Sequence, residues 1–225
     1  MTTDIVVIGA GGFGREVLDV LEAWNHAHHE DKFTIRGVVD DAPSQINVDR
    51  LTARGYRHLG PISTLGTMTP PPAVVVAIGN PDIKSKVAAT CADMGLHFPS
   101  FIHPSVVLGT RFSYGDGVVL CAGTVLSTNI TLGDQVHVGA GAIIGHDSVI
   151  ADYSSVNPGA VVSGEVVIGE RTLVGAGSVI LQGITIGSSV TVGAAACVTK
   201  EVLPGEVVVG IPARAIAPAN EKDIV

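Results

Sequence analysis

The sequence GDQVHVGAGAIIGHDSVI, residues 133–150, contains the pattern that decides the fold. It divides into three hexads that end in Val138, Ile144 and Ile150, and the six-residue spacing continues in both directions without a change of register. A period of six fits neither an amphipathic helix nor the alternation of a flat strand. Every sixth residue is apolar, and all but one are aliphatic: Leu108, Tyr114, Leu120, Leu126, Leu132, Val138, Ile144, Ile150, Val156, Val162, Ile168, Val174, Ile180, Ile186, Val192 and Val198.

Such a hexad repeat predicts a β-solenoid with a triangular cross-section, in which each hexad forms one side. The aliphatic residue points into the prism, and the glycine that often follows it helps the chain to turn the corner. Three sides make a coil of about 18 residues, so the repeat holds about five coils that stabilise one another by stacking. The alternative is a β-sandwich, which would show strands of variable length and a shifting register.

Composition narrows the possible functions. Hydrophobic residues make up 46% of the chain and aromatic residues only 4%, which suits a narrow aliphatic core. The net charge of -8 and the lack of a Lys/Arg run argue against a nucleic-acid partner. Three widely spaced cysteines form no CxxC pair and indicate a reducing compartment. No basic leader or apolar run of membrane-spanning length is present, so we expect a cytoplasmic protein without a membrane partner.

Residues 1–102 are predicted to form a small Rossmann-like α/β domain ahead of the solenoid domain of residues 103–225. The apolar run 5–8 ends in the glycine loop 9–14, and a helical pattern follows. This order of strand, loop and helix favours phosphate binding at the helix N-terminus, with a structural tight turn as the alternative. Further strands are expected at residues 36–39, 73–78 and 97–102, with a helix at 81–94. Residues 220–223 are expected to form a loose polar tail.

Two other features of this domain suggest ligand contacts. Asp40 and Asp41 end the second predicted strand, where a dinucleotide fold accepts hydrogen bonds from ribose. A solvated strand end is an equally good interpretation. Lys84 lies near the start of the predicted helix, within reach of an anion, and an ordinary surface lysine is the alternative. The domain is short for a whole NAD molecule.

His146 is the candidate catalytic residue of the solenoid. It follows an inward aliphatic residue by two positions, so its ring is expected to face outward, and Asp147 beside it could orient the ring. An idle surface histidine is the alternative. His137 is predicted to lie half a coil away, on another part of the prism. Because a catalytic zinc site needs three protein ligands, and no third histidine lies nearby, no metal site is expected.

Three segments together resemble the bacterial hexapeptide-repeat acetyltransferases of sugar nucleotides: GAGGFGREV at 9–17, IIGHDSVI at 143–150 and VVGIPARAI at 208–216. This family includes N-acetyltransferases of UDP- or GDP-linked 4-amino sugars and sialic acid O-acetyltransferases. The resemblance implies a nucleotide-sugar domain followed by a left-handed parallel β-helix that forms a homotrimer. It also implies acetyl transfer from acetyl-CoA to the amino group of a nucleotide-linked sugar. O-acetylation, or a non-catalytic nucleotide-sugar sensor, is the alternative.

The resemblance assigns roles to individual residues. His146 would be the general base, with Asp147 as its partner. The loop usually reads GAGGHGK in the family, so Phe13 and Arg15 depart from it, and Ser155 stands where a second histidine often lies. The nucleotide sugar would contact Gly9, Gly11, Gly12, Phe13, Gly14, Arg15, Asp40, Asp41, Gly79, Asn80 and Lys84. Acetyl-CoA would contact Ser155, Gly164, Ala176, Ala194, Lys200, Pro212 and Arg214.

Overall fold

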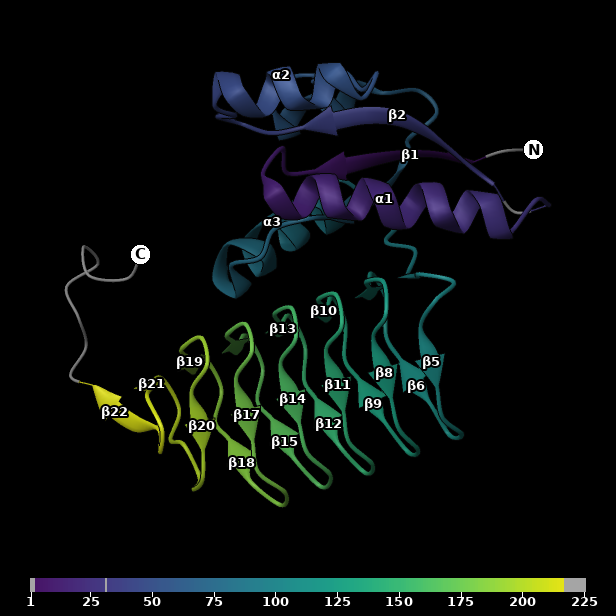
Figure 1. Cartoon of the computed structure of the whole chain (residues 1–225). Helices are drawn as coiled ribbons and strands as arrows, with labels where there is room; N and C mark the ends of the chain where they lie inside the picture. Colours follow the sequence, from purple (N-terminus) through teal and green to yellow (C-terminus); the bar gives the residue numbers. More distant parts are fainter. Residues whose placement is uncertain (1–2, 31, 217–225) are drawn as a thin grey trace.

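The computed structural model describes residues 3–30 and 32–216, which form two parts that follow one another along the chain (Figure 1). The polar stretch 220–223, expected to be a loose tail, lies outside these residues. Within the described residues, no helix has both the length and the apolar character needed to cross a membrane.

The first part is an α/β domain whose three parallel strands have the order β2-β1-β3. Its central strand is apolar and buried throughout from Ile5 to Ile8, as expected for a strand covered on both faces. The elements are β1 (Thr3–Ile8), α1 (Gly12–Ala27), β2 (Phe33–Val39), α2 (Gln45–Ala53), the 3₁₀ helix η1 (Ile62–Thr67), β3 (Ala73–Val76) and α3 (Pro81–Asp93).

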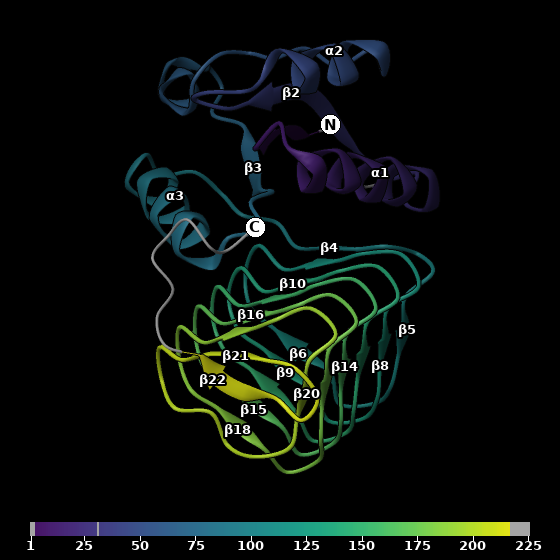
Figure 2. The ribbon, with the colours of Figure 1, turned by 60° about the vertical axis from the view of Figure 1, so that its left-hand side comes forward.

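The second part is the predicted left-handed parallel β-helix, with three sheets as its sides (Figure 2). The sheet under the first domain, here the domain-facing sheet, contains β4 (Phe101–Ile102), β7 (Val119–Leu120), β10 (His137–Val138), β13 (Ser155–Val156), β16 (Leu173–Val174), β19 (Thr191–Val192), β21 (Val207–Val209) and the antiparallel β22 (Arg214–Ile216).

The two other sheets complete the triangle. The valine-faced sheet contains β5 (Val107–Leu108), β8 (Val125–Leu126), β11 (Ile143–Ile144), β14 (Val161–Val162), β17 (Val179–Ile180) and β20 (Cys197–Val198). The third sheet contains β6 (Ser113–Tyr114), β9 (Thr131–Leu132), β12 (Val149–Ile150), β15 (Val167–Ile168) and β18 (Thr185–Ile186).

The aliphatic ladder forms the core of the prism, as the hexads predict. From Leu120 to Val198, every ladder residue is at most 2% exposed. Leu108 and Tyr114, at the start of the stack, are 41% and 49% exposed. Burial of one such aliphatic side chain stabilises the fold by about 1.5–3 kcal/mol, so stability accumulates coil by coil.

The prediction of a fourth strand of the first domain at residues 97–102 is wrong. Phe101 and Ile102 form β4, which pairs with β7 and begins the domain-facing sheet. The Phe101 N–H donates to the Val118 carbonyl at 2.8 Å, and only His97 reaches the first sheet, through a bridge to Ala73. Because Phe101 finds its backbone partner in the next coil, the chain enters the solenoid before the predicted boundary at residue 102.

The first domain packs on the domain-facing sheet (Figure 2). Phe101, Val119 and Cys121 of the solenoid share one buried apolar cluster with Leu18 and other residues of the first domain. This docking covers β10 and β13 and brings them next to the loops that follow β1 and β3.

Candidate functional site

His146 lies at the corner where the chain leaves β11 of the valine-faced sheet. Its side chain is 44% exposed, which confirms the predicted outward direction. Nδ1 of His146 lies 2.7 Å from Oδ2 of Asp147. The other carboxylate oxygen accepts a hydrogen bond of 2.6 Å from Nδ2 of Asn129, one coil away. Asp147 is thus held where it can orient the imidazole.

These contacts fix the tautomer of His146. The hydrogen bond from Asn129, and then that from His146, lower the pKa of Asp147 below its ordinary value, so its carboxylate is ionised at neutral pH. An ionised carboxylate can only accept a hydrogen bond, so the imidazole proton lies on Nδ1. Nε2 keeps a free lone pair, and the pair therefore has the arrangement of a general base with an orienting carboxylate.

Gly164 lies beside the His146 ring, at the same corner of the next coil. A Cβ atom on Gly164 would collide with the Nε2 edge of the imidazole. A glycine is therefore needed here for the ring to keep its place. Gly164 contributes the space that it leaves beside the ring, and its predicted contact with acetyl-CoA stays a prediction.

The glycine loop lies at the carboxyl end of β1 and leads into α1. Gly9 has a φ of 114°, and its Cβ would lie 2.7 Å from the Ala77 carbonyl oxygen, while a Cβ on Gly14 would collide with the Gly9 carbonyl oxygen. Gly11 has no atom within 4 Å of its Cβ position. Packing thus requires two glycines, whereas Gly11 and Gly12 leave open space at a helix N-terminus, which favours an anion.

Asp40 and Asp41, the two acidic residues predicted to contact ribose, accept hydrogen bonds from backbone N–H groups. Asp40 Oδ2 accepts a hydrogen bond of 2.8 Å from the Ala10 N–H of the glycine loop, and its Oδ1 accepts one of 3.0 Å from the Ala42 N–H. Asp41 Oδ1 accepts a hydrogen bond of 2.8 Å from the Ile62 N–H. Asp40 therefore shapes the loop directly, and a contact of either residue with ribose stays a prediction.

Arg15 and Asn80 also serve local structure. Arg15 Nη1 donates a hydrogen bond of 2.8 Å to Asn47 Oδ1, which directs the guanidinium towards α2. Asn80 Oδ1 accepts a hydrogen bond of 3.0 Å from the Ile83 N–H and so caps α3. A direct role for either side chain in substrate binding stays a prediction.

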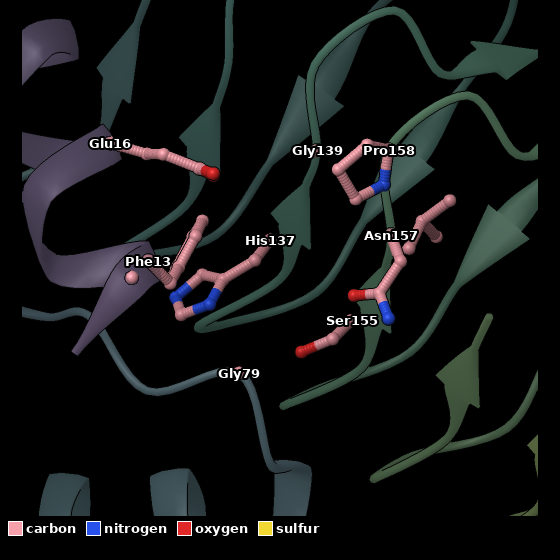
Figure 3. A pocket seen from close by; sticks show the side chains of 10 residues that line it. Phe13, Glu16, Gly79, His137, Gly139, Ser155, Asn157 and Pro158 are labelled. Atoms are coloured by element: carbon pink, nitrogen blue, oxygen red, sulfur yellow. The ribbon is translucent and has the colours of Figure 1, made fainter. Parts of the chain in front are cut away.

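A pocket of about 230 Å³ lies between the two parts of the chain (Figure 3). It opens between the loops after β1 and β3, where the strand order of the first sheet changes direction, and open α/β sheets bind ligands at this position. Side chains from both parts line it. The main ones are Phe13, Glu16, His137, Ser155 and Asn157, next to Gly79.

The sequence predicts Phe13 and Gly79 as substrate contacts but does not predict His137, Glu16 and Asn157 as pocket residues. A signal for one of them exists, because His137 and Ser155 are one coil apart (155 − 137 = 18) and each precedes an inward residue. The two therefore lie side by side on the outer face of the domain-facing sheet. The hexad period does not reveal that the first domain covers this face.

Lys84 is fully buried, which corrects its interpretation as a lysine free to reach an anion. Its Nζ donates hydrogen bonds to Ser155 Oγ at 2.8 Å and to the Ser154 carbonyl at 3.1 Å. Burial lowers the pKa of Lys84 well below its ordinary value. The two hydrogen bonds of its Nζ join α3 to β13.

Ser155 lies away from His146 of the same chain, and its predicted contact with acetyl-CoA stays a prediction. The sequence groups Ser155 with the cofactor residues, and in the structure its side chain is 2% exposed and belongs to the pocket under the first domain. The reason is the position of β13 in the domain-facing sheet, whereas His146 follows a strand of the valine-faced sheet. A contact between Ser155 and a thioester held at His146 of the same chain is therefore not supported.

The other residues predicted for acetyl-CoA do not form one groove in a single chain. Ala176 and Ala194 are exposed and stack at the corner between the domain-facing and valine-faced sheets, while Gly164 lies at the following corner. Lys200 and Arg214 meet in a pocket of about 260 Å³ at the C-terminal end of the prism. Pro212 lies in the turn between β21 and β22. The valine-faced sheet thus lies between the corner of Ala176 and Ala194 and the corner of Gly164.

The described residues contain no group of three or more His, Cys, Asp or Glu side chains that is arranged to hold a metal ion. His137 and His146, the pair closest to a metal-site pattern in the sequence, lie on different sides of the prism. The site consists of two separate halves in one chain: an exposed histidine–aspartate pair, and a pocket under the first domain.

Two protein-family models match this chain, one in the first domain and one in the solenoid. The model of the PglD N-terminal domain matches residues 4–91, and the model of the hexapeptide repeat of succinyl-transferase matches residues 165–200. A search of curated protein sequences gave no significant match.

Solved structures agree over 96% of the chain. The acetyltransferase domain of PglB from Neisseria gonorrhoeae in complex with acetyl coenzyme A is 28% identical, with a TM-score of 0.80 and all of that chain covered. PerB from Caulobacter crescentus, in complex with CoA and GDP-perosamine, is 26% identical, with a TM-score of 0.84 and 99% covered. WeeI from Acinetobacter baumannii is 29% identical, with a TM-score of 0.82 and full coverage. The chain therefore joins a PglD N-terminal domain to a hexapeptide-repeat β-helix, as these similar acetyltransferase structures do, and it is an acyltransferase enzyme.

Proposed function

We propose that this enzyme transfers an acetyl group from acetyl-CoA to the amino group of a nucleotide-linked amino sugar, with His146 as the general base. The observation that carries the proposal is the His146–Asp147 pair, whose free Nε2 lies beside Gly164 on an exposed corner. The similar PerB structure holds CoA together with GDP-perosamine, and the PglB domain holds acetyl coenzyme A, which supports this pair of substrates.

In this mechanism the neutral amine of the sugar attacks the thioester carbonyl, and Nε2 of His146 removes its proton as the C–N bond forms. The imidazolium then gives the proton to the CoA thiolate when the C–S bond breaks. Asp147 stabilises the imidazolium through the 2.7 Å contact at Nδ1. Such general-base assistance typically contributes a factor of about 10²–10⁴ in rate.

The oxyanion of the tetrahedral intermediate needs a hydrogen-bond donor close to Nε2. Among the described residues, the corner N–H of Glu165 donates to the His146 carbonyl at 2.7 Å, whereas that of Gly164 donates to no protein carbonyl. Gly164 lies beside the imidazole, so its N–H is the donor that we assign to the oxyanion.

The nucleotide sugar binds, in this proposal, where the glycine loop meets α1. Gly11 and Gly12 leave room for a diphosphate at the helix N-terminus, and Asp40 fixes the loop through the Ala10 N–H. The sugar then extends into the pocket that Phe13 helps to line. At the other end of the molecule, Lys200 and Arg214 supply positive charge for the phosphates of acetyl-CoA.

A homotrimer explains how the two separate halves of the site meet. The outward residues of the valine-faced sheet form an apolar row beside the His146 corner: Val107, Val125, Ile143, Val161, Val179 and Cys197. The exposed fractions of Val107, Val125 and Ile143 are 59%, 36% and 44%, so this row is available to a second copy. Packing of this face against a neighbour would bring His146 of one protomer to the pocket of the next.

Use of acetyl-CoA and the three free cysteines, Cys91, Cys121 and Cys197, support a cytoplasmic location as part of this proposal.

The proposal is tested by incubating the purified protein with acetyl-CoA and a panel of acceptors. The panel contains GDP-perosamine, a UDP-linked 4-amino sugar and a sialic acid, and the readouts are thiol release and the mass of the product. We expect thiol release with an amino sugar nucleotide and a product heavier by one acetyl group. Acetylation of the sialic acid alone would replace N- by O-acetylation, and no turnover with any acceptor would refute the proposal. The molar mass in solution should be that of three chains.

A further inference from the structure

His137 is a buried polar side chain without a partner. It is 2% exposed, and neither ring nitrogen has a hydrogen-bond partner in the described structure. Buried polar groups in native proteins are nearly always paired, so an orphaned pair of nitrogens calls for an explanation. His137 lines the pocket between the two parts of the chain, which places the unpaired ring next to a space that a ligand can fill.

The ring is covered by an aromatic side chain from the glycine loop. The centroids of the Phe13 and His137 rings are 4.9 Å apart, at an interplanar angle of 37° (Figure 3). Phe13 is half-buried and stands at the start of α1, next to the open Gly12. A rotation of its side chain would uncover the imidazole from the side of the loop where the diphosphate is proposed to bind.

The neighbours of His137 keep it neutral. Burial lowers its pKa well below the ordinary value, and a protonated Lys84 behind Ser155 would disfavour a second positive charge. A neutral imidazole offers one donor and one acceptor. Ser155 pairs with His137 across the sheet, and its hydroxyl adds a second adaptable group beside the ring.

We infer that His137 is a specificity-determining residue that recognises the sugar ring of the acceptor, through a hydroxyl or another neutral substituent that both donates and accepts hydrogen bonds. This inference rests on the proposed function, because it takes the ligand of the pocket to be the sugar of the nucleotide substrate. Phe13 moves aside when the sugar enters. Glu16, Ser155 and Asn157 supply the remaining polar lining, and Phe13 and Val156 supply apolar surface.

The orphaned ring also has a consequence for the free protein. A buried polar group without a partner costs desolvation free energy, which an apolar group of similar shape does not cost. His137→Phe should therefore raise the melting temperature by about 2–4 °C while it weakens recognition of the sugar. A ring kept only for packing would not show these opposite effects.

The experiment compares the wild type with His137→Phe and with His137→Asn, which keeps a donor and an acceptor. The probes are GDP-perosamine, a UDP-linked 4-amino sugar, GDP and UDP, with calorimetry for binding and thiol release for turnover. For His137→Phe we expect kcat/KM and affinity for the preferred nucleotide sugar to fall about tenfold, the loss of one good hydrogen bond. Affinity for the bare nucleotide and KM for acetyl-CoA should not change, and His137→Asn should recover part of the loss.

Three outcomes would overturn the inference. In the first, His137→Phe keeps kcat/KM within twofold of the wild type. In the second, the variant weakens binding of the bare nucleotide as much as binding of the nucleotide sugar. His137 would then only support the glycine loop. In the third, the wild type binds no nucleotide sugar. If the wild type binds the nucleotide sugar but transfers no acetyl group, the proposed function fails, and the binding difference between the variants still decides the role of His137.

Discussion

His137 and His146 are nine residues apart (146 − 137 = 9), yet their surroundings are opposite. His146 is half-exposed, its Nδ1 is bound by an ionised carboxylate, and its Nε2 is free. His137 is buried, has no partner and is held neutral. The same side chain is thus suited to proton transfer at one place and to hydrogen-bond recognition at the other.

The difference follows from the period of the solenoid. Nine residues are half a coil, so the two histidines occupy different sides of the prism, and only the side of His137 is covered by the first domain. His137 stands at an outward position of one face of the prism. Because the first domain packs on this face, the side chain is buried beside a pocket. The uncovered corner leaves the side chain of His146 exposed.

The largest effect is expected from removal of the exposed histidine. His146→Ala should lower kcat by a factor of about 10²–10⁴, because it removes the Nε2 atom that we assign to accept the proton from the amine. The affinity for the nucleotide sugar should stay within a few-fold of the wild type. Steady-state kinetics and calorimetry measure the two quantities, and His26→Ala, an exposed histidine on α1, is the matched control. Normal turnover of His146→Ala would show that His146 is not the general base. Either His137 or neither of the two histidines would then have this role.

A smaller loss is expected from Gly164→Ala. The added Cβ collides with the His146 ring, which is half-exposed and can swing away. A small misplacement of a catalytic group can cost up to about 10² in rate, so kcat should fall tenfold or more while the melting temperature stays the same. Gly66→Ala, where the Cβ meets nothing within 4 Å, is the control. An unchanged kcat would show that catalysis does not depend on the position of the His146 ring.

Asp147→Asn should reduce kcat by about tenfold, less than His146→Ala. Asn tolerates the left-handed backbone of this position, where φ is 59°, so the corner should keep its shape. The amide can still accept a bond from Nδ1 but carries no charge to stabilise the imidazolium. A loss larger than that of His146→Ala would show that the carboxylate itself acts on the substrate.

The smallest effect is expected on stability, at the buried side of the comparison. The folded pKa of Lys84 lies below its unfolded value, so the unfolded state binds the extra proton between the two values. Stability should therefore rise with pH in this window, by up to about 1.4 kcal/mol per pH unit. Lys84→Met should flatten this slope in denaturant titrations at pH 7–10, whereas Lys86→Met, exposed on the same helix, should not. Equal slopes in all three proteins would mean that Lys84 is charged in the fold.

The solenoid could be predicted almost completely from the sequence, because its geometry repeats. The hexads give the inward ladder, and the 18-residue coil explains why Asn129 reaches Asp147. The outward direction of His146 follows from the same count. The position of Gly164 beside it, one coil later, also follows (164 − 146 = 18).

The rest of the site depends on contacts that do not repeat. Lys84 comes from a helix of the first domain, and nothing in its local sequence shows that it will be buried against Ser155. The pocket around His137 exists only because the first domain rests on β10 and β13. Phe101 shows the same limit, since its strand pairs with a coil that the chain reaches only later. Tertiary packing decides these features, and the sequence pattern holds no trace of it.

A structure of the assembled enzyme with CoA and its amino sugar nucleotide would test the central claim most directly. The account predicts that the amino nitrogen lies within about 2.6–3.2 Å of Nε2 of His146, with the sugar ring against His137 and the diphosphate at the glycine loop. An amino group held at His137, with the His146 corner facing only solvent, would contradict it.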